Sequence, residues 1–60
     1  MEFCVIAAKG RDLERWFATL EEARAYARRR ARSTGCPYVV WKVVGYRIQW
    51  QGKVYPPPAA

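Results

Sequence analysis

The sequence holds 60 residues with a net charge of +6, and 52% of its residues are hydrophobic. A chain of this length forms one domain, and its apolar and aromatic content excludes a disordered chain. Histidine is absent, acids are few and no glycine-rich phosphate loop is present, so we expect a binding protein rather than an enzyme.

The composition also bears on location and on metal binding. No apolar run is long enough to cross a bilayer, and Glu2 stands where a signal peptide would carry basic residues, so we expect a cytoplasmic protein of a bacterial host cell with no membrane partner. Cys4 and Cys36, without a histidine, cannot build a usual zinc site, so we expect neither a metal nor another cofactor. The two thiols are either reduced and buried or joined in a disulfide, within or between chains.

The first predicted element is a strand over Glu2–Ala8. Alternate residues of a strand point to opposite faces of the sheet, and in this stretch both sets are apolar. A strand that is apolar on both sides must be covered on both sides. A helix supplies one cover and a second copy of the chain is the simplest source of the other, so we expect a homodimer.

Turn chemistry follows in residues Lys9–Asp12, where Gly10 can adopt a positive φ. Leu13–Ala18 then alternates in polarity and predicts a second strand, antiparallel to the first. As an alternative, Asp12–Arg15 forms a short helical turn.

The next element is a helix over Leu20–Thr34, bounded by independent signals at both ends. Thr19 can accept a hydrogen bond from an unpaired amide of the first turn, and with Glu22 it fits a capping box. Gly35 can close the helix in a left-handed conformation, and Pro37 prevents its continuation.

The two sides of this helix differ in size and charge. One face is small, which lets the helix lie close to a sheet; its residues are Leu20, Ala23, Ala27, Ala31 and Thr34. Arg24, Arg28 and Arg32 follow one another four residues apart along the opposite edge. These arginines are either a solvated face that keeps the chain soluble or a stripe that binds anions. The two readings stand about level, and the second is supported by residues 23–60, which hold eight Lys and Arg and no acid.

The longest strand signal is Pro37–Trp50, in which Gly45 indicates a bulge, a bend or a close backbone approach. Gln51-Gly52 is typical of a tight hairpin turn, and Lys53–Tyr55 of a short return strand. The predicted fold is therefore α+β, a small ββαββ (or βαββ) antiparallel sheet with one helix packed across it. It forms a single domain over residues 1–55, with a proline-rich tail over residues 56–60.

The candidate site combines cations and aromatic rings. Arginine holds phosphate in a bidentate fork and aromatic rings stack on bases. The predicted anion ligands are Arg24, Arg28, Arg32, Lys42 and Arg47. The predicted stacking residues are Trp41, Tyr46 and Trp50, with core or dimer interface as the alternative, favoured for Trp41.

Residues Phe17–Ala27, reading F-A-T-L-E-E-A-R-A-Y-A, resemble the strand-to-helix junction of AP2-type and phage-integrase arm-type DNA-binding domains. This resemblance implies a helix packed on a sheet whose strands touch DNA. Only two strands precede the helix here and more sheet follows it, so no functional residue is carried over. As a whole, the chain resembles the small accessory proteins of phages and prophages. That likeness implies a counter-defence role, by sequestering a nucleotide signal or by blocking a defence protein.

Two functions compete. The first is binding or sequestration of an anionic, phosphate-containing ligand, either a nucleotide or a nucleic acid, by a basic surface lined with aromatic residues. The second is a protein-interaction module that inhibits a host protein, with an acidic protein as the natural partner, supported by the apolar surplus and the aromatic residues.

Overall fold

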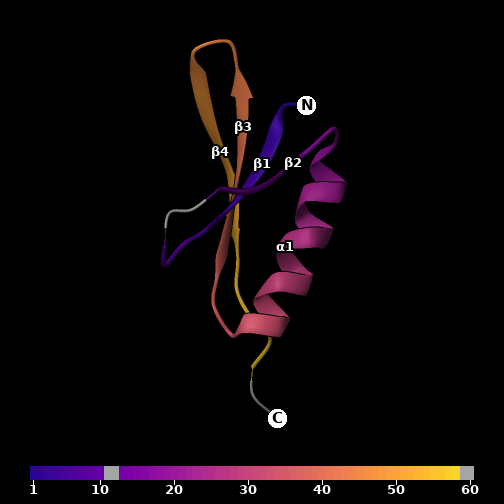
Figure 1. Ribbon diagram of the computed structural model, residues 1–60, viewed down its shortest axis with the longest axis vertical. Coiled ribbons are helices and arrows are strands. Elements are labelled where there is room, and N and C mark those ends of the chain that lie inside the picture. The colour runs from indigo at the N-terminus through magenta and orange to yellow at the C-terminus, as the bar shows by residue number, and fades with distance from the viewer. Residues whose placement is uncertain (11–12, 59–60) are drawn as a thin grey trace.

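The computed structural model describes residues 1–10 and 13–58. It contains four strands and one helix, in the order β1 (Phe3–Ala7), β2 (Leu13–Phe17), α1 (Leu20–Thr34), β3 (Tyr38–Val44) and β4 (Arg47–Val54). The strands form one antiparallel sheet in the order β2-β1-β3-β4, and α1 lies across one of its faces (Figure 1). The predicted ββαββ fold is confirmed, in preference to βαββ.

Both predicted helix caps are present. The Thr19 hydroxyl accepts a hydrogen bond from the Glu22 backbone N–H at 3.2 Å and donates one to the Glu22 carboxylate at 3.0 Å. At the other end Gly35 has φ 71° and donates its N–H to the Ala31 carbonyl at 2.8 Å. A left-handed residue at this place costs little only for glycine, so the chain can leave the helix and enter β3 within a few residues.

The core forms where the small face of α1 meets the sheet. Ala23, Ala27 and Ala31 have no exposed surface, and they pack with Val5, Val40 and the ring of Tyr38. Methyl side chains let the helix backbone approach the strands closely, as predicted from their spacing. Val5 and Val40 are the largest fully buried side chains described, so the interior is small. α1 lacks the length and the apolar character needed to cross a bilayer.

The hairpin between β3 and β4 lies elsewhere than predicted. The chain turns at Gly45-Tyr46, where Gly45 has φ 60°, and β4 then runs without interruption to Val54. The prediction of a turn at Gln51-Gly52 is therefore wrong. Gln51 is instead an extra residue in β4, because Val40 pairs with Gly52 while Trp41 pairs with Trp50. Glycine is common both in bulges and in tight turns, because both can require a positive φ. The local sequence Gln51-Gly52 therefore does not show which of the two is present.

A second bulge interrupts β2. Val5 pairs with Arg15 and Ile6 with Leu13, so that Glu14 is the extra residue. Glu14 reaches the helix, where its carboxylate contacts Tyr26 and Arg30. The simple alternation predicted for this strand is therefore wrong, and Leu13 and Trp16 share the sheet face that points away from α1.

Candidate functional site

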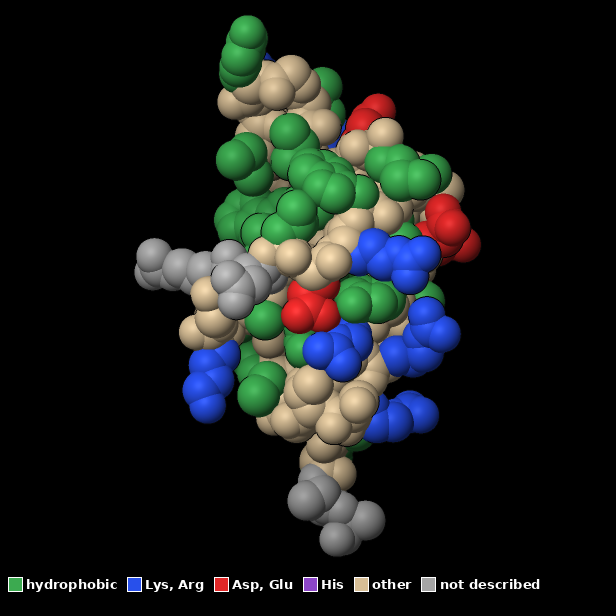
Figure 2. Space-filling view, viewed as in Figure 1, with side chains coloured by type: hydrophobic (Ala, Val, Ile, Leu, Met, Phe, Trp, Pro, Cys, Tyr) green, Lys and Arg blue, Asp and Glu red, His purple; other side chains and the backbone are tan. Residues whose placement is uncertain are grey.

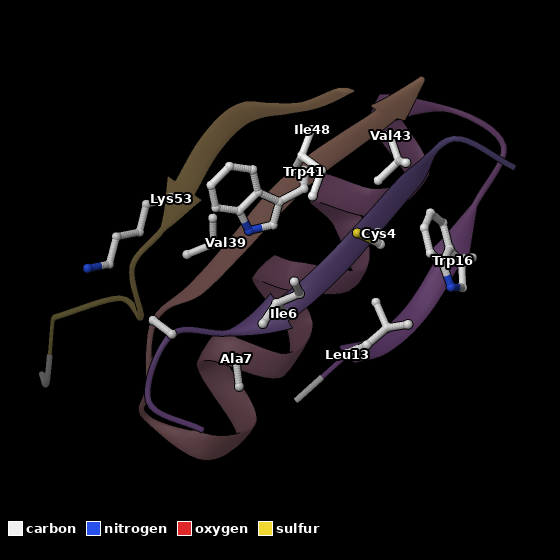
Figure 3. Close-up of a pocket in the computed structure, with 11 residues that line it drawn as sticks. Cys4, Ile6, Ala7, Leu13, Trp16, Val39, Trp41, Val43, Ile48 and Lys53 are labelled. Carbon is white, nitrogen blue, oxygen red and sulfur yellow. The ribbon is translucent and has the colours of Figure 1, made fainter. Parts of the chain in front are cut away.

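The sheet face opposite α1 is apolar and uncovered. We call it the open sheet face. Side chains paired in register stand side by side on one face of a sheet. They form three rows on this face: Trp16–Cys4–Trp41–Trp50, Leu13–Ile6–Val39–Lys53 and Val43–Ile48. All of these residues except Trp50 line a broad hollow of about 790 Å³. Figure 3 shows the side chains in front of the sheet and α1 behind it.

Charge is almost absent from this face. Of the described residues that line the hollow, only Lys53 is charged, and it lies on the outer strand β4. Several large side chains are exposed, including Trp50 (62%) and Ile48 (66%). A continuous exposed apolar patch is typical of a contact surface for another macromolecule.

The outer face of α1 carries the second candidate surface. Arg28, Arg29 and Arg32, together with Ala25, line an open hollow of about 380 Å³. Across residues 1–10 and 13–58, no carboxylate lies within the 4.0 Å salt-bridge limit of these three guanidinium groups. Figure 2 shows basic side chains gathered over the helix and hydrophobic ones over the strands.

A smaller hollow of about 160 Å³ adjoins this arginine face. Arg28 and Arg32 line it together with Tyr55 and Pro57, which follow the end of β4. The Tyr55 side chain is 67% exposed, and the Lys53 ammonium lies 5.3 Å from the centre of its ring. The structure thus brings an aromatic ring next to two of the three arginines.

The other predicted anion ligands have partners within the chain or lie apart. Arg24 donates to the Gln51 carbonyl at 3.3 Å and so joins α1 to the bulge of β4. The Lys42 ammonium lies 3.7 Å from the Glu2 carboxylate. Arg47 follows the hairpin turn and is paired in register with Val44, away from the helix.

The structure therefore divides the predicted site. Arg28 and Arg32 lie together on the helix, whereas Trp41 and Trp50 pair with each other on the opposite side of the sheet. Tyr46 is fully exposed in the hairpin turn. The two tryptophans proposed from sequence are thus separated from the arginine stripe by the thickness of the domain, and Tyr46 lies apart from both in the hairpin turn.

Two residues of the arginine face were not predicted. Arg29 follows Arg28 in the sequence, and its position three residues before Arg32 could have placed it on the same helix surface. Tyr55 could not have been found in this way, because its place beside α1 depends on the bulge and the length of β4.

Both cysteines are free thiols. Cys4 lies in the middle of the Trp16–Cys4–Trp41–Trp50 row and is only 3% exposed. Burial raises the pKa of the Cys4 thiol, and a backbone hydrogen bond at Trp41 partly opposes the rise, so the uncharged form is favoured there. Among the described side chains, no group of three His, Cys, Asp or Glu lies close enough to hold a metal ion.

No protein-family model, curated protein or solved structure matches this chain. The open sheet face and the arginine face are therefore the features from which a function can be inferred.

Proposed function

We propose that this protein is a small, non-enzymatic binding protein that holds a phosphate-containing anion on the outer face of α1. The observation that carries this proposal is the convergence of Arg28, Arg29 and Arg32 on one hollow without a described carboxylate in reach. The ligand is a nucleotide or a nucleic-acid strand. Its sequestration would serve a counter-defence role for this phage-type chain.

The chemistry of the arginine face supports such a ligand. Guanidinium groups bind phosphate oxygens through two parallel hydrogen bonds, and three of them can share one phosphate or neighbouring phosphates. Each pair of like charges one helical turn apart destabilises a helix by about 0.2–0.5 kcal/mol. A bound anion would remove this repulsion.

Tyr55 gives the same surface a stacking partner. Its exposed ring lies beside Arg28 and Arg32, where it can stack on the base of a nucleotide whose phosphate the arginines hold. Stacking on an aromatic side chain contributes about 1–3 kcal/mol per base. In this proposal Tyr55 has the stacking role that was predicted from sequence for Trp41, Tyr46 and Trp50.

The test is a titration with a labelled short oligonucleotide, a cyclic nucleotide and ADP-ribose. We expect Arg28→Gln/Arg32→Gln to weaken binding at least tenfold, and to reduce the slope of log K against log salt by about 2 for a nucleic acid. Arg15→Gln/Arg47→Gln removes the same charge from strand positions and serves as the control. If no ligand binds below millimolar concentration, or if both double variants lose affinity equally, the proposal is rejected.

A further inference from the structure

We propose that the open sheet face is the contact surface of a symmetric homodimer, in which this face of one copy packs against the same face of a second copy. The inference concerns the side of the sheet away from α1 and does not depend on the anion site. Homodimers commonly use one self-complementary patch on each subunit.

The open sheet face leaves a large amount of apolar surface uncovered. Trp50 and Ile48 on β4 are 62% and 66% exposed, and Leu13 and Trp16 on β2 are 48% and 39% exposed. The two tryptophans alone leave on the order of 200 Å² in water, since an aromatic side chain buries about 150–250 Å². The side chains of the central strands add the floor of the hollow between them.

The open sheet face is large enough for a stable dimer interface. A standard interface buries about 800 Å² on each partner. That is less than a fifth of the 4519 Å² that this protein exposes. One face of a four-stranded sheet, with residues of all four strands contributing, can supply it.

The core between α1 and the other face of the sheet is small. The helix covers the strands mainly with alanine methyl groups, and Tyr38 is the one buried side chain described that is larger than valine. Chains of this size are marginally stable when alone, and association is a common remedy. A second copy would turn the open sheet face into the middle layer of a larger core.

Charge favours a second copy over other occupants. A nucleic acid or an anionic membrane would need cations around the tryptophans, but of the described lining residues only Lys53 is charged. Arg28, Arg29 and Arg32 lie on the far side of the domain, on the helix surface away from the buried alanines. A face-to-face dimer needs no charge at its centre and holds the two arginine faces on opposite outer sides, so their repulsion is small.

The experiment compares two exposed apolar residues of one hairpin. Ile48 points to the open sheet face, whereas Val44 (46% exposed) points to the other face, since Val43 pairs with Ile48 and Val44 with Arg47. We expect sedimentation velocity to show a dimer for the unchanged protein at micromolar concentration. Ile48→Glu should weaken it at least about 100-fold, because it places a carboxylate in an apolar interface, while Val44→Glu should leave it within about threefold.

A second readout uses the tryptophans, all of which lie on this face. Dilution below the dissociation constant should shift their emission to longer wavelength, with the same midpoint as the sedimentation data. Leu13→Gln on β2 provides a second interface variant should Ile48→Glu fail to fold, and it should also produce a monomer. An unchanged protein that stays monomeric at high micromolar concentration overturns the proposal and leaves the face to a different protein. Equal weakening by Ile48→Glu and Val44→Glu overturns it too.

Discussion

At the scale of single residues, Glu14 joins β2 to the helix. Its Oε1 accepts hydrogen bonds from the Tyr26 hydroxyl at 3.1 Å and from Arg30 Nε at 3.0 Å. Tyr26 in turn packs against Phe17, with their ring centres 5.2 Å apart. Burial raises the pKa of the Tyr26 hydroxyl, and the Glu14 carboxylate raises it further. The bulge in β2 is therefore fixed by a side-chain contact as well as by its backbone.

We expect Tyr26→Phe to lower the free energy of unfolding by about 1 kcal/mol at neutral pH, because one hydrogen bond to a partly buried carboxylate is lost. Tyr46→Phe, at a fully exposed hydroxyl, should leave it unchanged. Urea titration measures both. An equal effect of the two substitutions would show that the Tyr26 hydroxyl contributes nothing.

The same contact has a pH dependence with a definite sign. The folded-state pKa of Tyr26 lies above the ordinary value of 10.0, so its stabilising effect is complete below about pH 10 and is lost as the pH rises through the folded value. Tyr26→Phe should therefore lose less stability at high pH than the unchanged protein does.

At the scale of elements, the contact between α1 and the sheet depends on the size of three side chains. Ala23, Ala27 and Ala31 have no exposed surface and stand at successive turns of the helix. A larger side chain at any of them would push the helix away from β1 and β3. Ala25, on the outer face of the same helix, is free of this limit.

We expect Ala27→Leu to destabilise the fold by about 2 kcal/mol, since overpacking of a filled core costs about 1–3 kcal/mol. Ala25→Leu adds the same atoms to the solvent side and should change stability by less than about 0.5 kcal/mol. Thermal unfolding followed by circular dichroism at 222 nm measures the difference. Equal melting temperatures for the two variants would contradict the close approach of helix and sheet.

At the scale of the whole molecule, the domain has one covered and one uncovered side. The helix contributes small residues to the interior between α1 and the sheet, and Tyr38, Phe17 and Tyr26 pack around them, while all three tryptophans lie on the open sheet face. The proposed dimer and the proposed anion site therefore occupy opposite sides of a thin domain. A change at one side should leave the other intact.

If the dimer forms, folding and association are linked, and the melting temperature must rise with protein concentration. We expect this rise for the unchanged protein and for Arg28→Gln/Arg32→Gln. The melting temperature of Ile48→Glu should be lower and independent of concentration. Scanning calorimetry over a wide concentration range tests this, and a constant melting temperature for the unchanged protein would contradict the linkage.

The features that were predicted correctly from the sequence are those that local sequence signals determine. The helix bounds follow from Thr19 and Gly35, and the small face follows from alanines at helical spacing. The ββαββ order and the first two strands follow from composition and turn residues, whereas the bounds of the last two strands were predicted wrongly.

What it missed depends on pairing between distant segments. The two extra residues, Glu14 and Gln51, are visible only once each strand is set against its neighbour. The contacts of Arg24 with Gln51 and of Lys42 with Glu2 join residues far apart in the chain. The sequence therefore did not show that these two predicted anion ligands have partners within the protein. The division of tryptophans and arginines between opposite sides has the same origin.

The positions of the two bulges have one more consequence. They lie in β2 and β4, the two outermost strands of the sheet, each of which would otherwise offer a regular row of backbone N–H and C=O groups to another chain. An extra residue in such a strand breaks that row and increases its twist, which hinders growth of the sheet by lateral addition. The bulges therefore disfavour open-ended fibrils, and the proposed dimer, which uses the face of the sheet and not its edges, would remain a closed particle of fixed size.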